Sequence, residues 1–185
     1  MQDIKDLKCK VIQAALDLAK TKSWADISMY QISQQAGVLE SDVFIVFEDK
    51  ESVLAGYMSS INKKIESMFG QHSFMDESPR DRIFDLIMER LDLLNDHKTA
   101  VISFVNCVSL DPKQIFAVLP NISKAMAQTL VLANENTHGI KGAVKVTALT
   151  TIYLKVLRFW INDETEDMAP TMACLDKALS FYDKI

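Results

Sequence analysis

The amino-acid sequence predicts an all-helical protein, and three observations lead to this prediction. Apolar residues recur at steps of three and four along most of the chain, whereas the alternation typical of β-strands is almost absent. The apolar share of the 185 residues is 49%, which is enough to bury a core. Residues that start or stop helices, such as Ser28, Gly37 and Pro79, separate the periodic segments. We therefore expect about nine helices.

Three short helices in helix-turn-helix order are predicted at the start of the chain. The first covers residues 4–21, and we expect Trp24 to cover its end. The second begins at Ser28, whose hydroxyl can accept a hydrogen bond in the first turn while Gln31 returns one. It ends at Gly37, which is free to adopt a positive φ. The third covers residues 40–47 and is the helix that would enter a groove of DNA.

Six longer helices are predicted over residues 50–69, 79–94, 100–109, 112–133, 143–161 and 169–183. Residues 71–76 are polar and mark the expected junction between two parts of the chain. Pro79 takes the first helical position, where its missing N–H costs little, whereas Pro120 is expected to break or kink its helix. The predicted division is a helix-turn-helix domain over residues 1–50 and a larger helical domain over residues 51–185.

The charge of the chain is unusual for a protein with a helix-turn-helix. The formal net charge is -5, and residues 1–60 carry nine carboxylates against six lysines. Contacts to phosphate need local positive charge. The four arginines, at positions 80, 82, 90 and 158, all follow the predicted helix-turn-helix, so guanine cannot be read there by arginine. A stripe of lysines near the N-terminus can still face a DNA backbone.

The sequence carries no pattern that indicates an enzyme or a metal site. Cys9, Cys107 and Cys174 are far apart, and the three histidines His72, His97 and His138 fall in predicted loops. Nucleophile motifs and a glycine-rich phosphate loop are missing from the sequence. We therefore expect no catalytic activity, no cofactor and no metal ion.

Membrane insertion and secretion are not expected either. The uncharged run over residues 99–110 is shorter than the roughly 20 apolar residues that cross a bilayer. Charged residues interrupt the N-terminus where a signal peptide would need an apolar core. These observations predict a cytoplasmic protein without a membrane span.

Three segments resemble the N-terminal domain of TetR-family transcriptional regulators. They are VIQAALDL at residues 11–18, ISQQAGV at residues 32–38 and VFIVFEDKESVL at residues 43–54. The resemblance spans about the first quarter of the chain, and the expected helices beyond it agree with the all-helical architecture of that family. It implies a homodimer, with the last two helices of each subunit in a four-helix bundle and an apolar ligand pocket within residues 51–185.

The resemblance also implies which residues would contact DNA. They are Ser28, Tyr30, Glu40, Ser41, Asp42, Phe44, Ile45 and Lys50. Lys50 matches the lysine with which the family contacts phosphate, and Ser28 and Tyr30 are possible hydroxyl donors to the backbone. The third helix departs from the family pattern, because Leu39 stands at the cap position and two carboxylates follow it.

Two further groups of residues are candidates for ligand binding and dimerisation. The expected pocket for a small apolar effector is lined by Phe84, Met88, Phe104, Phe116, Met126, Tyr153 and Leu157. Arg158, Lys155 and Asn106 are candidate anchors for an acid or a headgroup. The expected dimer interface contains Val156, Trp160, Met172, Leu175 and Leu179, on helices with more apolar surface than one face of a domain needs.

A second resemblance leaves the function open between two alternatives. Residues 160–167 and 171–176 are similar to the C-terminal end of ubiquinone-biosynthesis accessory proteins, which share the TetR fold but bind lipid. The first alternative is a one-component transcriptional regulator that binds operator DNA as a dimer under the control of a small apolar effector. The other is a lipid- or isoprenoid-binding protein that has lost DNA recognition.

Overall fold

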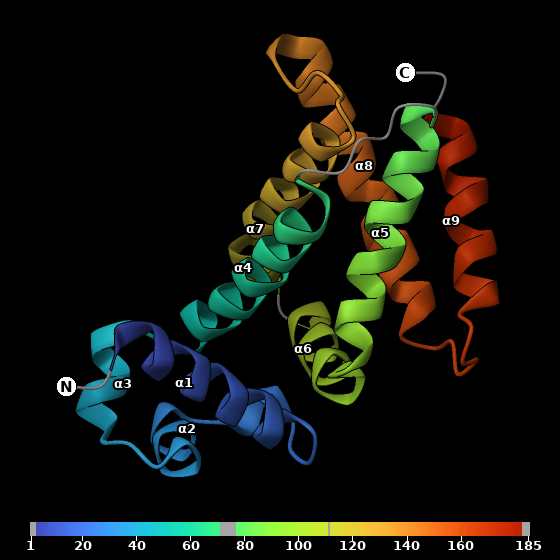
Figure 1. Ribbon diagram of the computed structural model, residues 1–185. Coiled ribbons are helices and arrows are strands. Elements are labelled where there is room, and N and C mark those ends of the chain that lie inside the picture. Colours follow the sequence, from blue (N-terminus) through green and yellow to red (C-terminus); the bar gives the residue numbers. More distant parts are fainter. Residues whose placement is uncertain (1–2, 71–76, 111, 183–185) are drawn as a thin grey trace. The chain divides into compact units, whose positions relative to one another are not determined.

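The computed structural model describes residues 3–70, 77–110 and 112–182 and is drawn in Figure 1. These residues form nine α-helices, one short 3-10 helix and no strand, so the all-helical prediction is confirmed. The elements are α1 (Ile4–Ala19), η1 (Trp24–Asp26), α2 (Met29–Ala36), α3 (Glu40–Val46), α4 (Lys50–Phe69), α5 (Pro79–Asn95), α6 (Lys98–Leu110), α7 (Pro112–Leu132), α8 (Gly139–Trp160) and α9 (Ala169–Tyr182).

Three details differ from the sequence-based expectation. Trp24 lies in a 3-10 turn of its own. Pro120 lies inside α7, which continues through it as one helix. Helix α8 begins at Gly139, four residues before the predicted start at residue 143. Gly139 and Gly142, which favour a loop in the sequence, belong to its first turn. The predicted junction at residues 71–76, with His72, and the predicted helix end at residue 183 lie outside the described residues.

The contacts divide the chain into two compact units. The first unit contains Met1–Ser60 and Asp96–Leu119, and the second contains Ile61–Asn95 and Pro120–Ile185. This division follows contacts, and the predicted domain boundary at residue 50 stays a prediction. Helix α4 begins in the first unit and ends in the second, so its two halves serve different cores.

In the first unit, α1 packs against α2, α3 and α6, and α2 packs against α3. Its core is formed by Val11, Ala15, Leu16, Trp24, Ile32, Val43 and Val53, all with 2% exposure or less. The ring of Trp24 lies in this core, edge-on to Phe104 of α6 at 4.7 Å between centroids. The backbone N–H of Trp24 also donates to Oγ of Ser103 at 2.9 Å. The turn after α1 is therefore fixed by α6, which is far from it in sequence.

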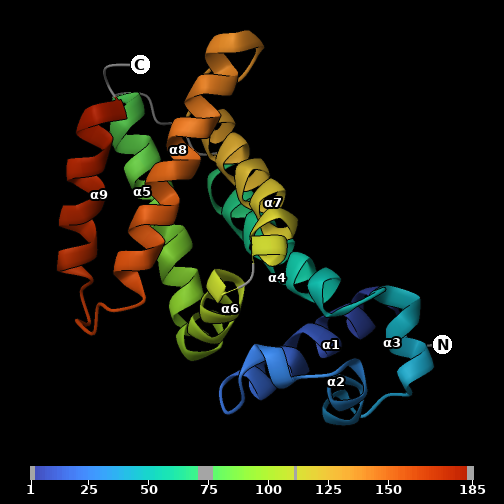
Figure 2. The same ribbon diagram turned by 180° about the vertical axis from the view of Figure 1, so that it is seen from behind.

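The second unit is built on α5, α8 and α9, which lie side by side in both views (Figures 1 and 2). The later parts of α4 and α7 complete it. Its core is mainly aliphatic, with Ile65, Ile83, Leu86, Ile87, Leu91, Met126, Leu130, Leu149, Leu175 and Leu179 below 2% exposure, and it also contains Trp160. This apolar interior is the environment of any charged group buried in the unit.

Helix α7 is long and apolar. Lys113–Leu132 meets the length and composition of a membrane span, with a mean hydropathy of 1.4 and 28% of that window buried. Core helices of water-soluble domains pass the same test, and this helix contributes Ile122, Met126 and Leu130 to buried positions.

Candidate functional site

Helices α2 and α3 form a helix-turn-helix whose geometry is fixed by local hydrogen bonds. Oγ of Ser28 accepts the backbone N–H of Gln31 at 3.2 Å, and Oε1 of Gln31 accepts the backbone N–H of Ser28 at 3.0 Å. This is the reciprocal cap that the sequence predicts at the start of α2. Gly37 ends the helix with φ of 66°, in the left-handed region that glycine adopts without strain. The cap and the glycine together set the direction in which α3 leaves.

Helix α3 presents its predicted reading residues to solvent. Val43 is fully buried and holds the helix against the first unit. The exposed residues Glu40, Ser41, Phe44 and Ile45 follow the spacing of one helix face, while Asp42 is half-buried. Leu39, at the cap position, provides no side-chain hydrogen bond to the first turn. The exposed face of α3 therefore combines two apolar side chains with one hydroxyl and one carboxylate, and it carries no cation.

Lys50 is held by the protein itself. Its Nζ donates to the backbone carbonyls of Trp24 at 3.0 Å, Ala25 at 3.1 Å and Ile27 at 3.4 Å. An ammonium group has three N–H donors, so these three carbonyls can occupy all of them. Nζ also lies 5.7 Å from the centre of the Trp24 ring, which adds a cation–π attraction. The lysine that resembles a phosphate contact thus ties the start of α4 to the η1 turn.

Three of the remaining lysines of the first unit, Lys5, Lys8 and Lys10, lie on α1. Lys10 pairs with Asp6 at 3.3 Å, and Lys20 pairs with Asp17 at 2.7 Å. The hydrogen bond from Lys20 lowers the pKa of Asp17. Lys5 and Lys8 are exposed on the first two turns of α1, and no carboxylate pairs with them in the described part of the chain. These two lysines and the exposed Lys22 are available to meet phosphate.

The seven predicted pocket residues fall in both units. Met126, Tyr153 and Leu157 are buried in the second unit, where Phe84 and Met88 are half-buried. Phe104 belongs to the first unit and packs on Trp24, and Phe116 of that unit is 75% exposed. Asn106 is exposed in the first unit as well. Five of the seven residues therefore belong to the second unit, and the aromatic pair from α6 and α7 belongs to the first.

Arg90 is the residue of this core that sequence reasoning missed. It lies on α5 with 4% exposure, and Nη1 donates to Oδ1 of Asn62 on α4 at 2.5 Å. Nε and Nη2 are buried without a hydrogen-bond acceptor among the described residues. Burial lowers the pKa of the guanidinium, while interaction with Tyr153 opposes that shift. The available signal was an arginine one turn from Leu86 and Leu94 in the apolar stripe of α5.

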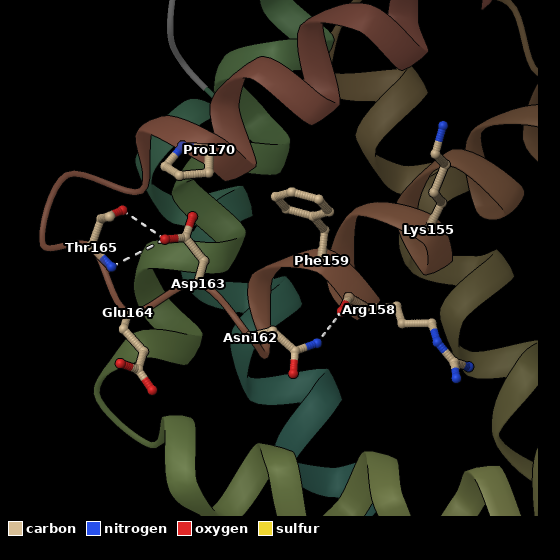
Figure 3. A pocket seen from close by; sticks show the side chains of 8 residues that line it. All are labelled: Lys155, Arg158, Phe159, Asn162, Asp163, Glu164, Thr165 and Pro170. Atoms are coloured by element: carbon tan, nitrogen blue, oxygen red, sulfur yellow. Dashed lines mark hydrogen bonds between the residues drawn. The ribbon is translucent and has the colours of Figure 1, made fainter.

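The predicted anchors Lys155 and Arg158 lie at the surface. They line an open groove of about 580 Å³ where α8 ends and the loop to α9 begins (Figure 3). Its lining residues are Lys155, Arg158, Phe159, Asn162, Asp163, Glu164, Thr165 and Pro170. Nδ2 of Asn162 donates to the carbonyl of Arg158 at 3.0 Å, which extends the end of α8. Both side chains are exposed and therefore do not serve the buried core.

The predicted dimer residues need a correction. Val156, Trp160, Leu175 and Leu179 have no exposed surface, because they fill the core between α5, α8 and α9 of their own subunit. Side chains that are completely covered cannot contact a partner in this conformation. Met172 alone of the five is exposed, at 40%. Among the residues whose burial is described, the large apolar ones exposed on these two helices are instead Ile140, Val144, Leu154, Phe159 and Met172.

The cysteines do not form a site. Cys9 is exposed, Cys107 is buried, Cys174 is half-buried, and all three are free thiols. Within residues 3–70, 77–110 and 112–182, no three histidine, cysteine or carboxylate side chains gather where they could hold a metal ion.

The fold resembles that of solved TetR-family transcriptional regulators over nearly the whole chain. The TetR regulator from Nitrosomonas europaea ATCC 19718 is 20% identical with a TM-score of 0.78, over 96% of this chain and 98% of that chain. The regulator from Rhodococcus sp. RHA1 is 16% identical with a TM-score of 0.67, over 95% and 97% of the two chains. NalD from Pseudomonas aeruginosa, the secondary repressor of the MexAB-OprM multidrug efflux pump, is 14% identical with a TM-score of 0.60, over 95% and 96%.

No protein-family model matches the sequence, and no curated protein sequence is similar to it. The structural similarity defines the class of fold, which is the helix-turn-helix plus helical-bundle architecture of TetR-type regulators. The predicted resemblance to that family is confirmed at this level.

Proposed function

We propose that this protein is a one-component transcriptional regulator of the TetR type, which binds operator DNA as a homodimer and responds to a small effector held in the second unit. The observation that carries the proposal is the reciprocal cap at Ser28, followed by the left-handed Gly37 and an outward face on α3. A helix-turn-helix of this kind offers its second helix to the major groove. The fold around it is similar to that of solved TetR regulators over 96% and 95% of this chain.

The exposed face of α3 would read bases mainly without positive charge. Phe44 and Ile45 are 51% and 69% exposed and suit the methyl group of thymine, whereas Glu40 can accept a hydrogen bond from the amine of cytosine. Ser28 and Tyr30 would donate hydroxyl hydrogen bonds to phosphate. Lys5 and Lys8 on α1 would supply most of the charge. We therefore expect few phosphate contacts and modest affinity.

Effector control would act through α4. Its first turn holds Lys50 on the η1 turn, and its later half carries Asn62, which contacts Arg90 in the second unit. A ligand that binds beside Arg90 with different affinity in two conformations would shift their populations, and α4 would carry the shift to the helix-turn-helix.

One observation favours the alternative, a TetR-fold protein that binds lipid or isoprenoid and no longer recognises DNA. The first turn of α3 has two carboxylates, Glu40 and Asp42, and the amine of Lys50 is already surrounded by carbonyls. Both features weaken attraction to phosphate. The buried aliphatic core of the second unit would suit either function.

A salt titration of binding to the DNA upstream of the protein's own gene tests the proposal. A regulator should prefer this DNA to a scrambled duplex, and log K should fall with log salt by about 0.9 for each phosphate neutralised. Replacing Phe44 and Ile45 together by Ala should remove the preference. The matched control is Ile140→Ala, since Ile140 is 86% exposed on α8, far along the chain from the helix-turn-helix.

Equal binding to both duplexes, or no binding, would contradict the proposal of a regulator. The alternative of a lipid-binding protein would then remain. The carrier makes a separate prediction, which is that mass spectrometry of the purified protein detects a co-purified lipid.

A further inference from the structure

Arg90 places a positive charge inside the aliphatic core of the second unit. It lies in the apolar stripe of α5, one turn from Leu86 and one turn from Leu94, and is 4% exposed. Its guanidinium makes one hydrogen bond, from Nη1 to Oδ1 of Asn62 at 2.5 Å. The Nε and Nη2 groups are buried and have no acceptor in the part of the chain that the structure describes. Buried N–H groups are almost always hydrogen-bonded in proteins, so this pair requires an explanation.

No carboxylate of the described residues balances this charge. Asp163 is the carboxylate buried in the second unit, and its oxygens accept hydrogen bonds from Thr165 and Thr171. Tyr153 interacts electrostatically with Arg90, but burial raises the pKa of its phenol and keeps that group neutral. Arginine remains protonated in proteins, and a buried charge without a counter-ion is strongly disfavoured.

The other two arginines of α5 each donate to strong acceptors, and Nε is buried in all three. Arg82 donates to the backbone carbonyls of Ala133 at 3.2 Å and Glu77 at 2.7 Å. Arg80 donates to the carboxylate of Asp176 at 2.7 Å. Each of them joins separate segments of the chain through strong acceptors. Arg90 instead donates once, to a neutral amide, and differs from the other two in that its Nη2 is also buried without an acceptor among the described residues.

We propose that Arg90 anchors the carboxylate of an apolar acid that binds within the second unit. Nε–H and the adjacent Nη2–H lie on one edge of a guanidinium and point in parallel, which matches the two oxygens of a carboxylate. The unit around it supplies fully buried aliphatic side chains such as Ile65, Leu86 and Met126 for the apolar part of the ligand. The role of this acid as an effector rests on the proposed function, whereas the binding itself does not.

Calorimetric titration with four probes tests the inference. The probes are dodecanoate and 4-phenylbutyrate, each compared with its own primary amide, which has nearly the same shape and no charge. We expect at least one acid to bind the full-length protein about tenfold or more tightly than its amide, as for hydrogen bonds to charged groups. Arg90→Met should remove that preference. Arg158→Met, which alters the exposed arginine of the surface groove, should leave it unchanged.

Thermal unfolding separates an anchor from a structural residue. Without ligand, Arg90→Met should melt at the same temperature as the wild type or higher, because methionine needs no hydrogen bonds in an apolar core. The preferred acid should raise the melting temperature of the wild type and leave that of Arg90→Met unchanged. A clear fall in the melting temperature of ligand-free Arg90→Met would overturn the inference.

Three other results would also overturn it: failure of both acids to bind, equal binding of acid and amide, or loss of the preference in Arg158→Met. The DNA titration, done without acid, keeps this test apart from the proposed function. Specific DNA binding without acid binding would remove the Arg90 inference alone. Acid binding through Arg90 without specific DNA binding would contradict the proposed regulator and would indicate a protein that carries an apolar acid.

Discussion

Asp163 and Thr171 join the loop after α8 to the first turn of α9. Oδ2 of Asp163 accepts the backbone N–H of Thr171 at 3.0 Å and its hydroxyl at 2.5 Å. Oδ1 accepts the backbone N–H of Thr165 at 3.1 Å and its hydroxyl at 2.6 Å. Burial raises the pKa of Asp163, but these four hydrogen bonds outweigh it and hold the pKa at about 2. The carboxylate therefore stabilises the α8–α9 connection in its charged form.

We expect this carboxylate to make the stability of the protein depend on pH. Its pKa in the folded protein lies below that of an unfolded chain, so its contribution is fully present above pH about 4 and is lost as the pH falls towards 2. The shift corresponds to about 2 kcal/mol of unfolding free energy. In urea unfolding at pH 7, Asp163→Asn should have a lower unfolding free energy than the wild type. At pH 3 the difference between the two should be smaller. Glu164→Gln, at an exposed neighbouring position, is the control. The same difference in unfolding free energy at both pH values would contradict a role for the charged Asp163 carboxylate.

Replacing Lys50 by Met should destabilise the first unit. The substitution leaves the carbonyls of Trp24, Ala25 and Ile27 without their shared donor. We expect a loss of about 2 kcal/mol in urea unfolding, as for hydrogen bonds to a charged group. The exposed Lys22→Met should change stability by less than about 0.5 kcal/mol. Unchanged stability combined with weaker DNA binding would instead support Lys50 as a phosphate contact.

The sequence predicted local structure well because local structure depends on neighbouring residues. The capping box of Ser28 and Gln31 and the left-handed turn at Gly37 are encoded within ten residues, and both were predicted correctly. Helix α4 has the predicted bounds, since its apolar periodicity is uninterrupted. A short resemblance was also enough to predict the fold confirmed by solved structures.

The candidate sites were harder to predict because they depend on contacts between distant segments. Periodicity showed that Val156 and Leu175 are apolar, but it could not tell whether a helix of the same subunit or a partner covers them. The carbonyls that receive Lys50 come from a turn more than twenty residues earlier. Arg90 makes its one described hydrogen bond to Asn62, which lies on another helix. Charge and spacing along the sequence reveal none of these relationships.

Gly142 should tolerate no side chain. A Cβ added there would lie 2.1 Å from the carbonyl carbon of Thr137 and 2.2 Å from its oxygen, and backbone atoms cannot easily move away. We expect Gly142→Ala to lower the unfolding free energy by about 2 kcal/mol or more. Lys141→Ala, at the exposed preceding position, should have little effect. Thermal unfolding of the two variants measures the difference, and equal melting temperatures would show that the loop before α8 can shift.

Dimerisation should depend on the exposed residues of α8 and α9, because the apolar residues beneath them are already covered within the subunit. We expect sedimentation equilibrium to give twice the chain mass of 20.8 kDa. Leu154 and Met172 are 38% and 40% exposed on these helices, so Leu154→Glu and Met172→Glu should bury a charge in the interface and shift the equilibrium towards monomer. Ile4→Glu, at an exposed apolar position on α1, is the control and should leave the mass unchanged. A wild-type monomer at micromolar concentration would exclude the α8–α9 interface. A dimer that withstands both substitutions would place the interface on another surface.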